Sequence, residues 1–235
     1  MTEPISDYLC LDLETTGLNP KLDKIIEIGA VKVKGGVIAD TFSTFIKPGK
    51  ALTERVSVLT GIREQDLETA PTIQKVLPEF LEFAEELPLL GHRILFDFSF
   101  IKRAAVNEKL TFERSGIDTL KIARKYLPDL PSRRLSDLCE HYGIELHAHR
   151  ALEDARATHF LYQKLWKEFQ PDFEPEPLIY KVKREGPATK AQKQRLVRLL
   201  KQYGLTADCE IEMLTKNEAS RLIDRILASY GILQK

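Results

Sequence analysis

Four acidic residues stand out in this sequence because their types and spacing could hold a cation. Asp12 and Glu14 are two residues apart in YLCLDLETTGL, Asp97 lies in GHRILFDFSF, and Asp154 lies in HAHRALEDA. On an extended strand, residues i and i+2 project from the same face, so the carboxylates of Asp12 and Glu14 would lie side by side and repel. Magnesium or manganese removes this repulsion, because hard divalent cations prefer carboxylate oxygens. The acids therefore predict a metal site.

The order of three sequence blocks strengthens this prediction. An isolated Asp-x-Glu pair is weak evidence, since such pairs also occur at the solvated ends of ordinary strands. Here DLETTGL, HRILFDFSFI and HRALEDA follow one another along the chain. From Tyr8 to about Trp166 the sequence resembles the DEDDh exonucleases, whose best-known members are proofreading epsilon-type subunits of replicative DNA polymerases. The resemblance implies an α/β fold with a ribonuclease H-like mixed sheet flanked by helices.

The resemblance also implies a role for each acid. One cation would be bound by Asp12, Glu14 and Asp154, a second would rest mainly on Asp12, and Asp97 would act through bound water. Two cations about 3.5 to 4 Å apart stabilise both the attacking and the leaving oxygen of an in-line phosphoryl displacement. The expected reaction is hydrolysis of the terminal phosphodiester, which releases a nucleoside 5′-monophosphate and shortens the strand from its 3′ end.

His149 is the candidate general base, because an imidazole titrates near neutrality and can take a proton from the attacking water. His149 and Asp154 are five positions apart, which on a regular helix separates them by roughly 140°. Both can face one pair of cations if His149 lies on a loop and Asp154 in the first helical turn. The sister class of these enzymes has a tyrosine four residues before the last acid, where this chain has Arg150. The histidine subclass is therefore indicated.

Five residues are candidates for binding the substrate. Thr15, Thr16, Gly17 and Leu18 follow the first acids on a turn, where the resemblance implies that they receive the terminal nucleotide. A plain exit from strand to loop is the alternative. The family commonly has asparagine after the histidine of the second block, whereas this chain has Arg93. Arg93 either contacts a phosphate or points into solvent.

Other tempting residues are assigned to the fold rather than to catalysis. Asp118 in IDTL is expected to support the structure, and Phe96 is expected to pack in the core. The remaining histidines lack a catalytic setting and are expected to be structural: His92, His141, His147 and His159.

The composition indicates a globular protein. A chain of 235 residues with 43% hydrophobic content can bury one substantial core and a smaller second one. Its three cysteines are widely spaced without a Cys-x-x-Cys pair, which argues against a disulfide framework or a thiolate zinc site and favours the reducing cytoplasm. Eighteen consecutive apolar residues occur nowhere, and no signal-like segment begins the chain, so neither a membrane span nor secretion is expected.

The resemblance implies an exonuclease domain over residues 1–170, and hydrophobic periodicity predicts that this part of the chain alternates strands and helices. The expected strands are 8–13, 25–34, 37–46 and a short one from Leu89, with Gly35-Gly36 as a hairpin turn. The expected helices are 72–86, about 96–107, about 118–126, about 135–142 and about 152–169.

Residues 171–187 contain four prolines and are predicted to be a linker to a small helical domain of unknown role at 188–235. One helix is expected over 189–203, and a second begins with a Thr215–Glu218 capping box and could end at Gly231. The part from Tyr180 onward has a charge balance of +6, against −6 for the rest. This basic surface suits nucleic acid, but a solvated helix face explains it better.

The sequence therefore favours a 3′-to-5′ exonuclease with two magnesium or manganese ions, acting on single-stranded DNA or RNA ends. The last phosphodiester reaches the carboxylates most easily where the bases are unpaired. Such an enzyme could work within a polymerase or repair assembly or in RNA turnover. The competing interpretation is a non-catalytic adaptor of the same fold that binds a polymerase or a nucleic-acid end. The presence of all five catalytic positions argues against an adaptor.

Overall fold

The computed structural model describes residues 5–146, 149–170 and 173–230; His147, Pro171 and Gly231 lie outside these ranges. Its centre is a six-stranded sheet with the order β3-β2-β1-β4-β5-β6. The first three strands are antiparallel, β4 and β5 run parallel to β1, and β6 is antiparallel to β5. The strands are β1 (Tyr8–Thr15), β2 (Ile25–Lys34), β3 (Val37–Phe45), β4 (Leu89–Gly91), β5 (Ser115–Asp118) and β6 (Glu176–Pro177).

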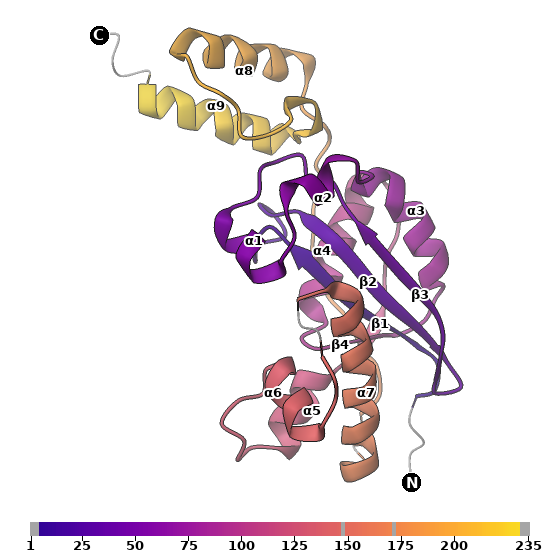
Figure 1. Ribbon diagram of the computed structural model, residues 1–235. Helices are drawn as coiled ribbons and strands as arrows, with labels where there is room; N and C mark the ends of the chain where they lie inside the picture. The colour runs from indigo at the N-terminus through magenta and orange to yellow at the C-terminus, as the bar shows by residue number, and fades with distance from the viewer. Residues whose placement is uncertain (1–4, 147–148, 171–172, 231–235) are drawn as a thin grey trace.

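Helices cover both faces of this sheet (Figure 1). The pair α3 and α4 packs on one face, and α5, α6 and α7 pack on the other. The predicted mixed sheet flanked by helices is thereby confirmed. The helices are α1 (Glu54–Thr60), α2 (Glu64–Glu68), α3 (Ile73–Ala84), α4 (Leu95–Asn107), α5 (Thr119–Tyr126), α6 (Leu135–Tyr142), α7 (Ala151–Phe169), α8 (Lys190–Tyr203) and α9 (Lys216–Tyr230). None of the helices in the described part of the chain combines the length and the apolar character of a transmembrane segment.

Strand β1 distributes its side chains strictly between the two faces. Leu9, Leu11 and Leu13 pack with α3 and α4, whereas Tyr8 and Cys10 pack with α7. Because side chains alternate along a strand, the next even-numbered residues also face α7. Those residues are the acids Asp12 and Glu14.

Four elements were not expected from the sequence. Helices α1 and α2 have seven and five residues, and they cover Ile26 of the sheet with Val56 and Leu67, together with Ile62 between the two helices. Strands β5 and β6 have four and two residues. All four are too short to show a clear hydrophobic period.

Part of the proline-containing stretch belongs to the sheet. Glu176 and Pro177 pair with β5, and the backbone N–H of Leu178 donates to the carbonyl oxygen of Arg114 at 2.8 Å. Leu178 and Tyr180 also pack against the main core. The predicted linker thus pairs with the sheet as far as Leu178 and packs against its core as far as Tyr180.

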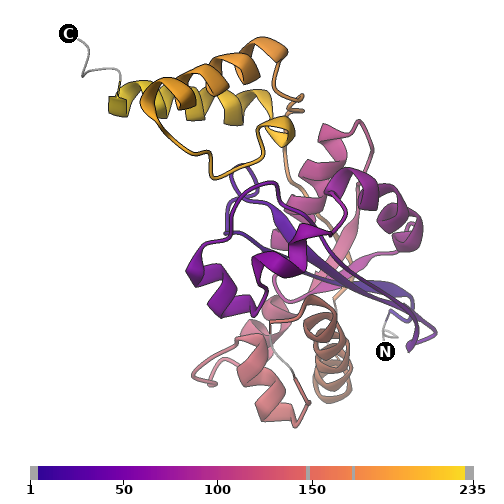
Figure 2. The same ribbon diagram turned by 45° about the horizontal axis from the view of Figure 1, so that its top comes forward.

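Helices α8 and α9 form a second hydrophobic core, around Leu196, Leu199, Ile223 and Ile226. Figures 1 and 2 show this pair beyond one end of the sheet, beside the loop that connects β1 to β2 and the segment that follows β3. We call residues 188–230 the C-terminal unit. The division of the chain into domains at 171 and 188 stays a prediction.

Candidate active site

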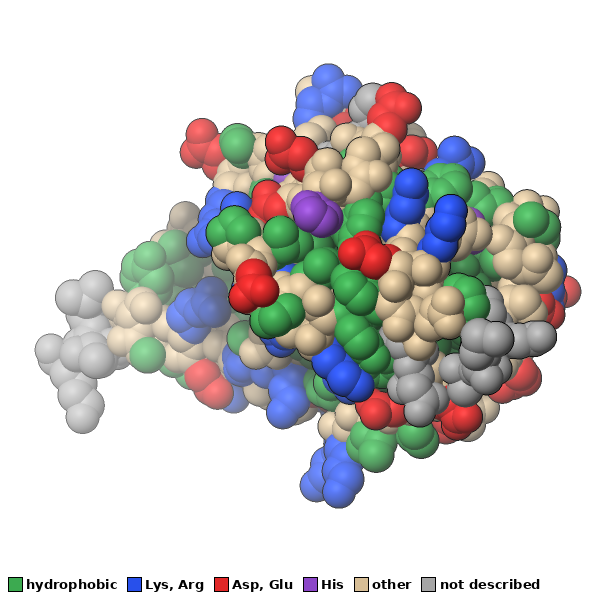
Figure 3. Space-filling model, turned by 90° about the horizontal axis from the view of Figure 1, so that it is seen from below, with side chains coloured by type: hydrophobic (Ala, Val, Ile, Leu, Met, Phe, Trp, Pro, Cys, Tyr) green, Lys and Arg blue, Asp and Glu red, His purple; other side chains and the backbone are tan. Residues whose placement is uncertain are grey.

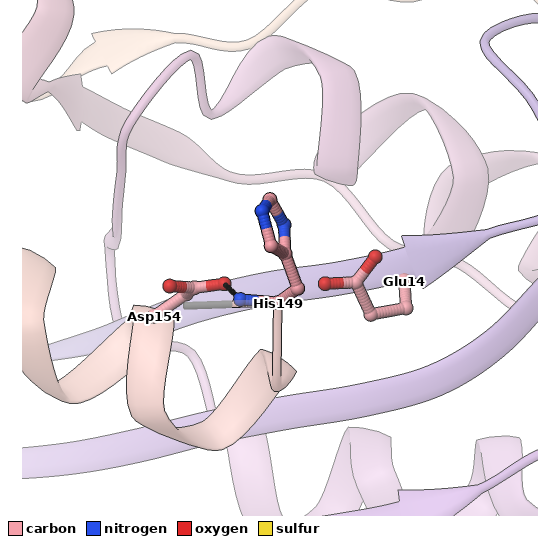
Figure 4. A group of neighbouring side chains, drawn as sticks. All are labelled: Glu14, His149 and Asp154. Atoms are coloured by element: carbon pink, nitrogen blue, oxygen red, sulfur yellow. Dashed lines mark hydrogen bonds between the residues drawn. The ribbon is translucent and has the colours of Figure 1, made fainter. Parts of the chain in front are cut away.

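Three of the predicted residues meet at the end of β1. Single ligand atoms of Glu14, His149 and Asp154 all lie within 4.8 Å of one another. Figure 4 shows the imidazole of His149 standing between the two carboxylates. Glu14 comes from the end of β1, Asp154 from the first turn of α7, and His149 from the loop just before that helix. The structure thus joins segments more than a hundred residues apart into one group of oxygen and nitrogen ligands.

The start of α7 places His149 and Asp154 on the same side. The helix begins at Ala151, so His149 precedes it and Asp154 lies in its first turn. His149 has a φ of 70°, in the left-handed region that L-residues rarely adopt. Its backbone N–H donates to Oδ2 of Asp154 at 3.0 Å, which stabilises this turn. The His149 side chain is exposed, whereas Asp154 is buried.

Glu27 on β2 is a buried acid that sequence reasoning missed. It lies directly opposite Glu14 in the β1–β2 ladder and is only 1% exposed. Its Oε1 accepts from Nη2 of Arg150 at 2.9 Å, and its Oε2 accepts from the backbone N–H of Ala151 at 3.2 Å. Glu27 thus fixes the first residues of α7. Its only signal in the sequence is a single charge within the apolar run IIEIGAV.

Gly29 makes room for the same helix. A Cβ atom on Gly29 would lie 2.1 Å from the backbone carbon of Ala151, far inside van der Waals contact. Gly29 lies opposite Asp12 in the ladder, two residues from Glu27 on the same face of β2. The absence of a side chain at Gly29 therefore lets the first turn of α7 rest directly on the sheet.

Asp12 and Asp97 lie close to the three ligands but are not members of the 4.8 Å group. Asp97, in the first turn of α4, is buried and accepts from the backbone N–H of Leu13 at 3.1 Å. Leu13 is the residue between the two acids of β1. Burial raises the pKa of Asp12 well above its usual range, and the neighbouring carboxylates of Asp97, Asp154 and Glu14 raise it further.

The pKa values of the other three acids are also raised. Burial, followed by repulsion from Asp154 and Glu27, raises the pKa of Glu14 to about 8. The pKa of Asp154 is raised to about 6, chiefly by burial. Burial also raises the pKa of Asp97 well above its ordinary value. Carboxylates gathered with one imidazole nitrogen fit a divalent cation, which would remove their mutual repulsion.

The predicted nucleotide-binding turn is a closed loop. Oγ1 of Thr15 donates to the carbonyl oxygen of Gly17 at 2.7 Å. The backbone N–H of Thr16 donates to the carbonyl oxygen of Lys24 at 2.8 Å. A Cβ atom on Gly17 would lie 2.5 Å from a carboxylate oxygen of Asp23, so the loop closes tightly there. Leu18 projects from it and is 78% exposed. The apolar side chain of Leu18 is thus accessible to a ligand.

The backbone of Arg93, just before α4, is bonded to the side chain of Asp118. Arg93 has a φ of 79°, and its backbone N–H donates to Oδ1 of Asp118 at 2.9 Å. The same oxygen caps α5 by accepting from the backbone N–H of Leu120. The exposed guanidinium of Arg93 lies 5.9 Å from the centre of the half-buried Phe96 ring. Asp118 thus has a structural task, and the Arg93 side chain stays accessible.

Two other histidines are held in structural hydrogen bonds. His92 bonds through Nδ1 to Oγ1 of Thr119 at 2.9 Å and through Nε2 to the carbonyl oxygen of Arg133 at 2.8 Å. Nδ1 of the buried His159 bonds to the hydroxyl of Tyr8 at 2.9 Å. Both rings tie neighbouring elements together, as expected from the sequence.

Comparison with known proteins places this architecture in a family. A family model described as Exonuclease matches residues 9–162, which is more than half of the chain. A PolC-type DNA polymerase III of Caldanaerobacter subterraneus subsp. tengcongensis is 44% identical over 165 residues, which are 70% of this chain and 12% of that protein. The DNA polymerase III subunit epsilon of Aquifex aeolicus is 38% identical over 163 residues, covering 68% of this chain and 81% of that subunit.

Solved structures agree with these relatives. A zinc-bound complex of Escherichia coli Exonuclease I with single-stranded DNA matches with a TM-score of 0.63 at 25% identity, covering 71% of this chain and 41% of that one. Exonuclease X in complex with 5′ overhanging duplex DNA matches in fold, with a TM-score of 0.57 at 24% identity over 72% of this chain and 96% of that one. The chain belongs to the DEDD exonuclease family, with the ribonuclease H-like fold that its three acidic blocks predicted.

Proposed function

We propose that this protein is a 3′-to-5′ exonuclease that hydrolyses the terminal phosphodiester of a single strand and releases nucleoside 5′-monophosphates. One observation carries the proposal: Glu14, His149 and Asp154 converge within 4.8 Å at the end of β1. Asp12 lies on the same face of that strand, and the surrounding fold belongs to an exonuclease family.

Each residue of the site has a distinct task. Asp12, Glu14 and Asp154 hold two divalent cations, Mg²⁺ or Mn²⁺, with Asp97 beside them. Such cations, when bound, stabilise the charge that develops at the scissile phosphate. His149 takes the proton of the attacking water, and its exposed ring on the loop before α7 can reach that water from the solvent side.

The proposed substrate is a single-stranded 3′ end, with DNA favoured over RNA. The terminal nucleotide meets the loop 15–18, where Leu18 offers apolar contact, and Arg93 contacts a phosphate further along. Figure 3 shows one face on which acidic and basic side chains are interspersed with apolar ones. The DNA polymerase names of the relatives support DNA as the polymer and a polymerase assembly as a partner.

The test is release of labelled mononucleotides from 3′-end-labelled single-stranded DNA and RNA. We expect release with Mg²⁺ or Mn²⁺ and none with excess chelator, with DNA degraded faster than RNA. Label at the 5′ end should yield a ladder that shortens from the 3′ side. If neither polymer releases mononucleotides under any metal condition, the enzyme proposal is wrong and an adaptor remains.

A further inference from the structure

The loop Thr16–Lys24, which leads from β1 into β2, is organised around Asp23. Its Oδ2 accepts from the backbone N–H of Asn19 at 3.0 Å, and its Oδ1 accepts from Nζ of Lys50 at 3.1 Å. At the base of the loop, the backbone N–H of Lys24 donates to Oγ1 of Thr16 at 3.0 Å. The position of the predicted nucleotide-binding residues therefore depends on what holds Lys24 and Lys50.

Lys50 lies in a segment that is clasped by the C-terminal unit. The backbone N–H of Ala51 donates to the carbonyl oxygen of Asp208 at 2.9 Å. The backbone N–H of Glu210 donates to the carbonyl oxygen of Gly49 at 2.7 Å. Gly49 has a φ of 69°, and a Cβ on it would lie 2.8 Å from the sulfur of Met213. The C-terminal unit thus forms an isolated antiparallel bridge with this segment, between Cys209 and Lys50, and Lys50 in turn bonds to Asp23 of the loop.

A second connection reaches the loop directly. Nζ of Lys24 lies 2.6 Å from Oε1 of Glu218, and the Glu218 side chain is only 14% exposed. The other oxygen of Glu218 accepts from the backbone N–H and the hydroxyl of Thr215, which closes the predicted capping box of α9. The first turn of α9 is therefore joined to the base of the loop.

We propose that the C-terminal unit is a positioning element for the exonuclease site, which sets the Thr16–Lys24 loop through the Lys24–Glu218 ion pair and the clasp on residues 49–51. This inference rests on the proposed function, because the loop matters for catalysis only as the receiver of the terminal nucleotide. The unit acts on substrate binding through the loop and does not itself contact the nucleotide.

The decisive comparison is between two glutamates of the full-length protein. Glu218→Gln removes the charge that pairs with Lys24 but keeps the capping box, since glutamine serves equally at this position. Glu212→Gln is the control, because Glu212 is 84% exposed and pairs with Lys193 inside the C-terminal unit. Each variant is assayed for kcat and KM on a long single strand and on a trinucleotide, and for hydrogen exchange in the peptide covering residues 16–24.

We expect Glu218→Gln to raise KM about threefold to tenfold on both substrates, as the loss of a partly buried ion pair implies, with kcat changed less. Amide exchange in residues 16–24 should accelerate, while Glu212→Gln leaves both measurements unchanged. Lys24→Gln should have the same effect as Glu218→Gln, and the double variant should be no worse than either.

Two outcomes would overturn the inference. Unchanged KM and unchanged exchange in Glu218→Gln would show that the ion pair positions nothing. A defect confined to the long strand, with an altered salt dependence, would show instead that the C-terminal unit binds nucleic acid itself. Lack of activity in the unmodified protein would refute the proposed function, whereas the exchange comparison would still test the connection between Glu218 and the loop.

Discussion

Glu14 and Glu27 lie directly opposite each other across the β1–β2 ladder. Like charges in directly opposed positions destabilise a sheet, so this pair needs compensation. Glu27 has it in Arg150 and in the backbone N–H of Ala151. For Glu14, burial and repulsion from the neighbouring acids instead raise the pKa to about 8. The charge of Glu27 is thus compensated by Arg150 and Ala151, whereas Glu14 belongs to the group that could hold a cation.

Arg150→Gln should destabilise the protein because it leaves the carboxylate of Glu27 buried with one backbone donor. The Arg150 side chain is 51% exposed, so we expect a loss of about 2 kcal/mol in the free energy of unfolding, less than for a fully buried pair. Turnover should also fall, because the first turn of α7 carries Asp154. Denaturant unfolding and the exonuclease assay measure the two effects.

The matched control for this prediction is Arg134→Gln. Arg134 pairs with Asp137 at 2.9 Å, but its side chain is 81% exposed, so the expected loss is below about 0.5 kcal/mol. The double variant Glu27→Gln/Arg150→Gln should recover part of the stability, since no buried charge then remains. If it is less stable than the Arg150 variant, the charge on Glu27 is not the cause.

The metal-free protein should lose stability as the pH rises. The pKa of Glu14 is raised from 4.5 to about 8 and that of Asp154 from 3.8 to about 6, chiefly by burial. A raised carboxyl pKa means that the folded chain holds these protons more tightly than the unfolded chain. Their contribution is therefore complete below the unfolded values and is lost as the pH rises through about 6 and then about 8.

Thermal unfolding in chelator measures this contribution. We expect Tm to fall between about pH 5 and about pH 8, and saturating Mg²⁺ to reduce the fall because bound cations replace the protons. A Tm that rises over this range in chelator would contradict the direction of both shifts.

Asp12→Asn should separate stability from function. The substitution removes a carboxylate whose pKa is raised by burial and by its acidic neighbours, so the metal-free protein should become more stable. Turnover should fall about a hundredfold or more if Asp12 is the proposed cation ligand. Calorimetry without metal measures the stability, and single-turnover kinetics with Mn²⁺ measure the rate of the reaction. Loss of both stability and turnover would indicate a structural rather than a metal-binding role.

The site could be predicted from the sequence where it depends on local spacing. Asp12 and Glu14 share a face because a strand alternates, and His149 precedes the helix because five positions cannot share a helical face. Glu27 could not be found this way, since its bonds to Arg150 span 123 positions and depend on the register of β1 and β2. Helices α1 and α2 were missed for a different reason: they are shorter than two helical periods.

His149→Ala should impair the chemical step more than metal binding. The imidazole is exposed and lies within 4.8 Å of the ligand atoms of Glu14 and Asp154. Removal of a general base typically lowers the rate by about 10²- to 10⁴-fold. Mn²⁺ affinity, measured by titration calorimetry, should change far less than it does in Asp12→Ala. Equal loss of affinity in the two variants would mean that His149 is a metal ligand.

Gly29→Ala should displace the helix that carries the last acid. Its Cβ would lie 2.1 Å from the backbone carbon of Ala151, where no flexible side chain can yield, so the first turn of α7 must move. We expect a loss of about 2 to 3 kcal/mol in unfolding free energy, as for an overpacked core. Because a shift of about 1 Å in a catalytic group can lower the rate about a hundredfold, turnover should fall even where the variant is fully folded.

Gly186→Ala is the control, since the nearest neighbour of its added Cβ would be Cε of Lys216 at 3.9 Å. Equal turnover in the two variants at a temperature where both are folded would show that the close contact between α7 and Gly29 does not set the position of Asp154.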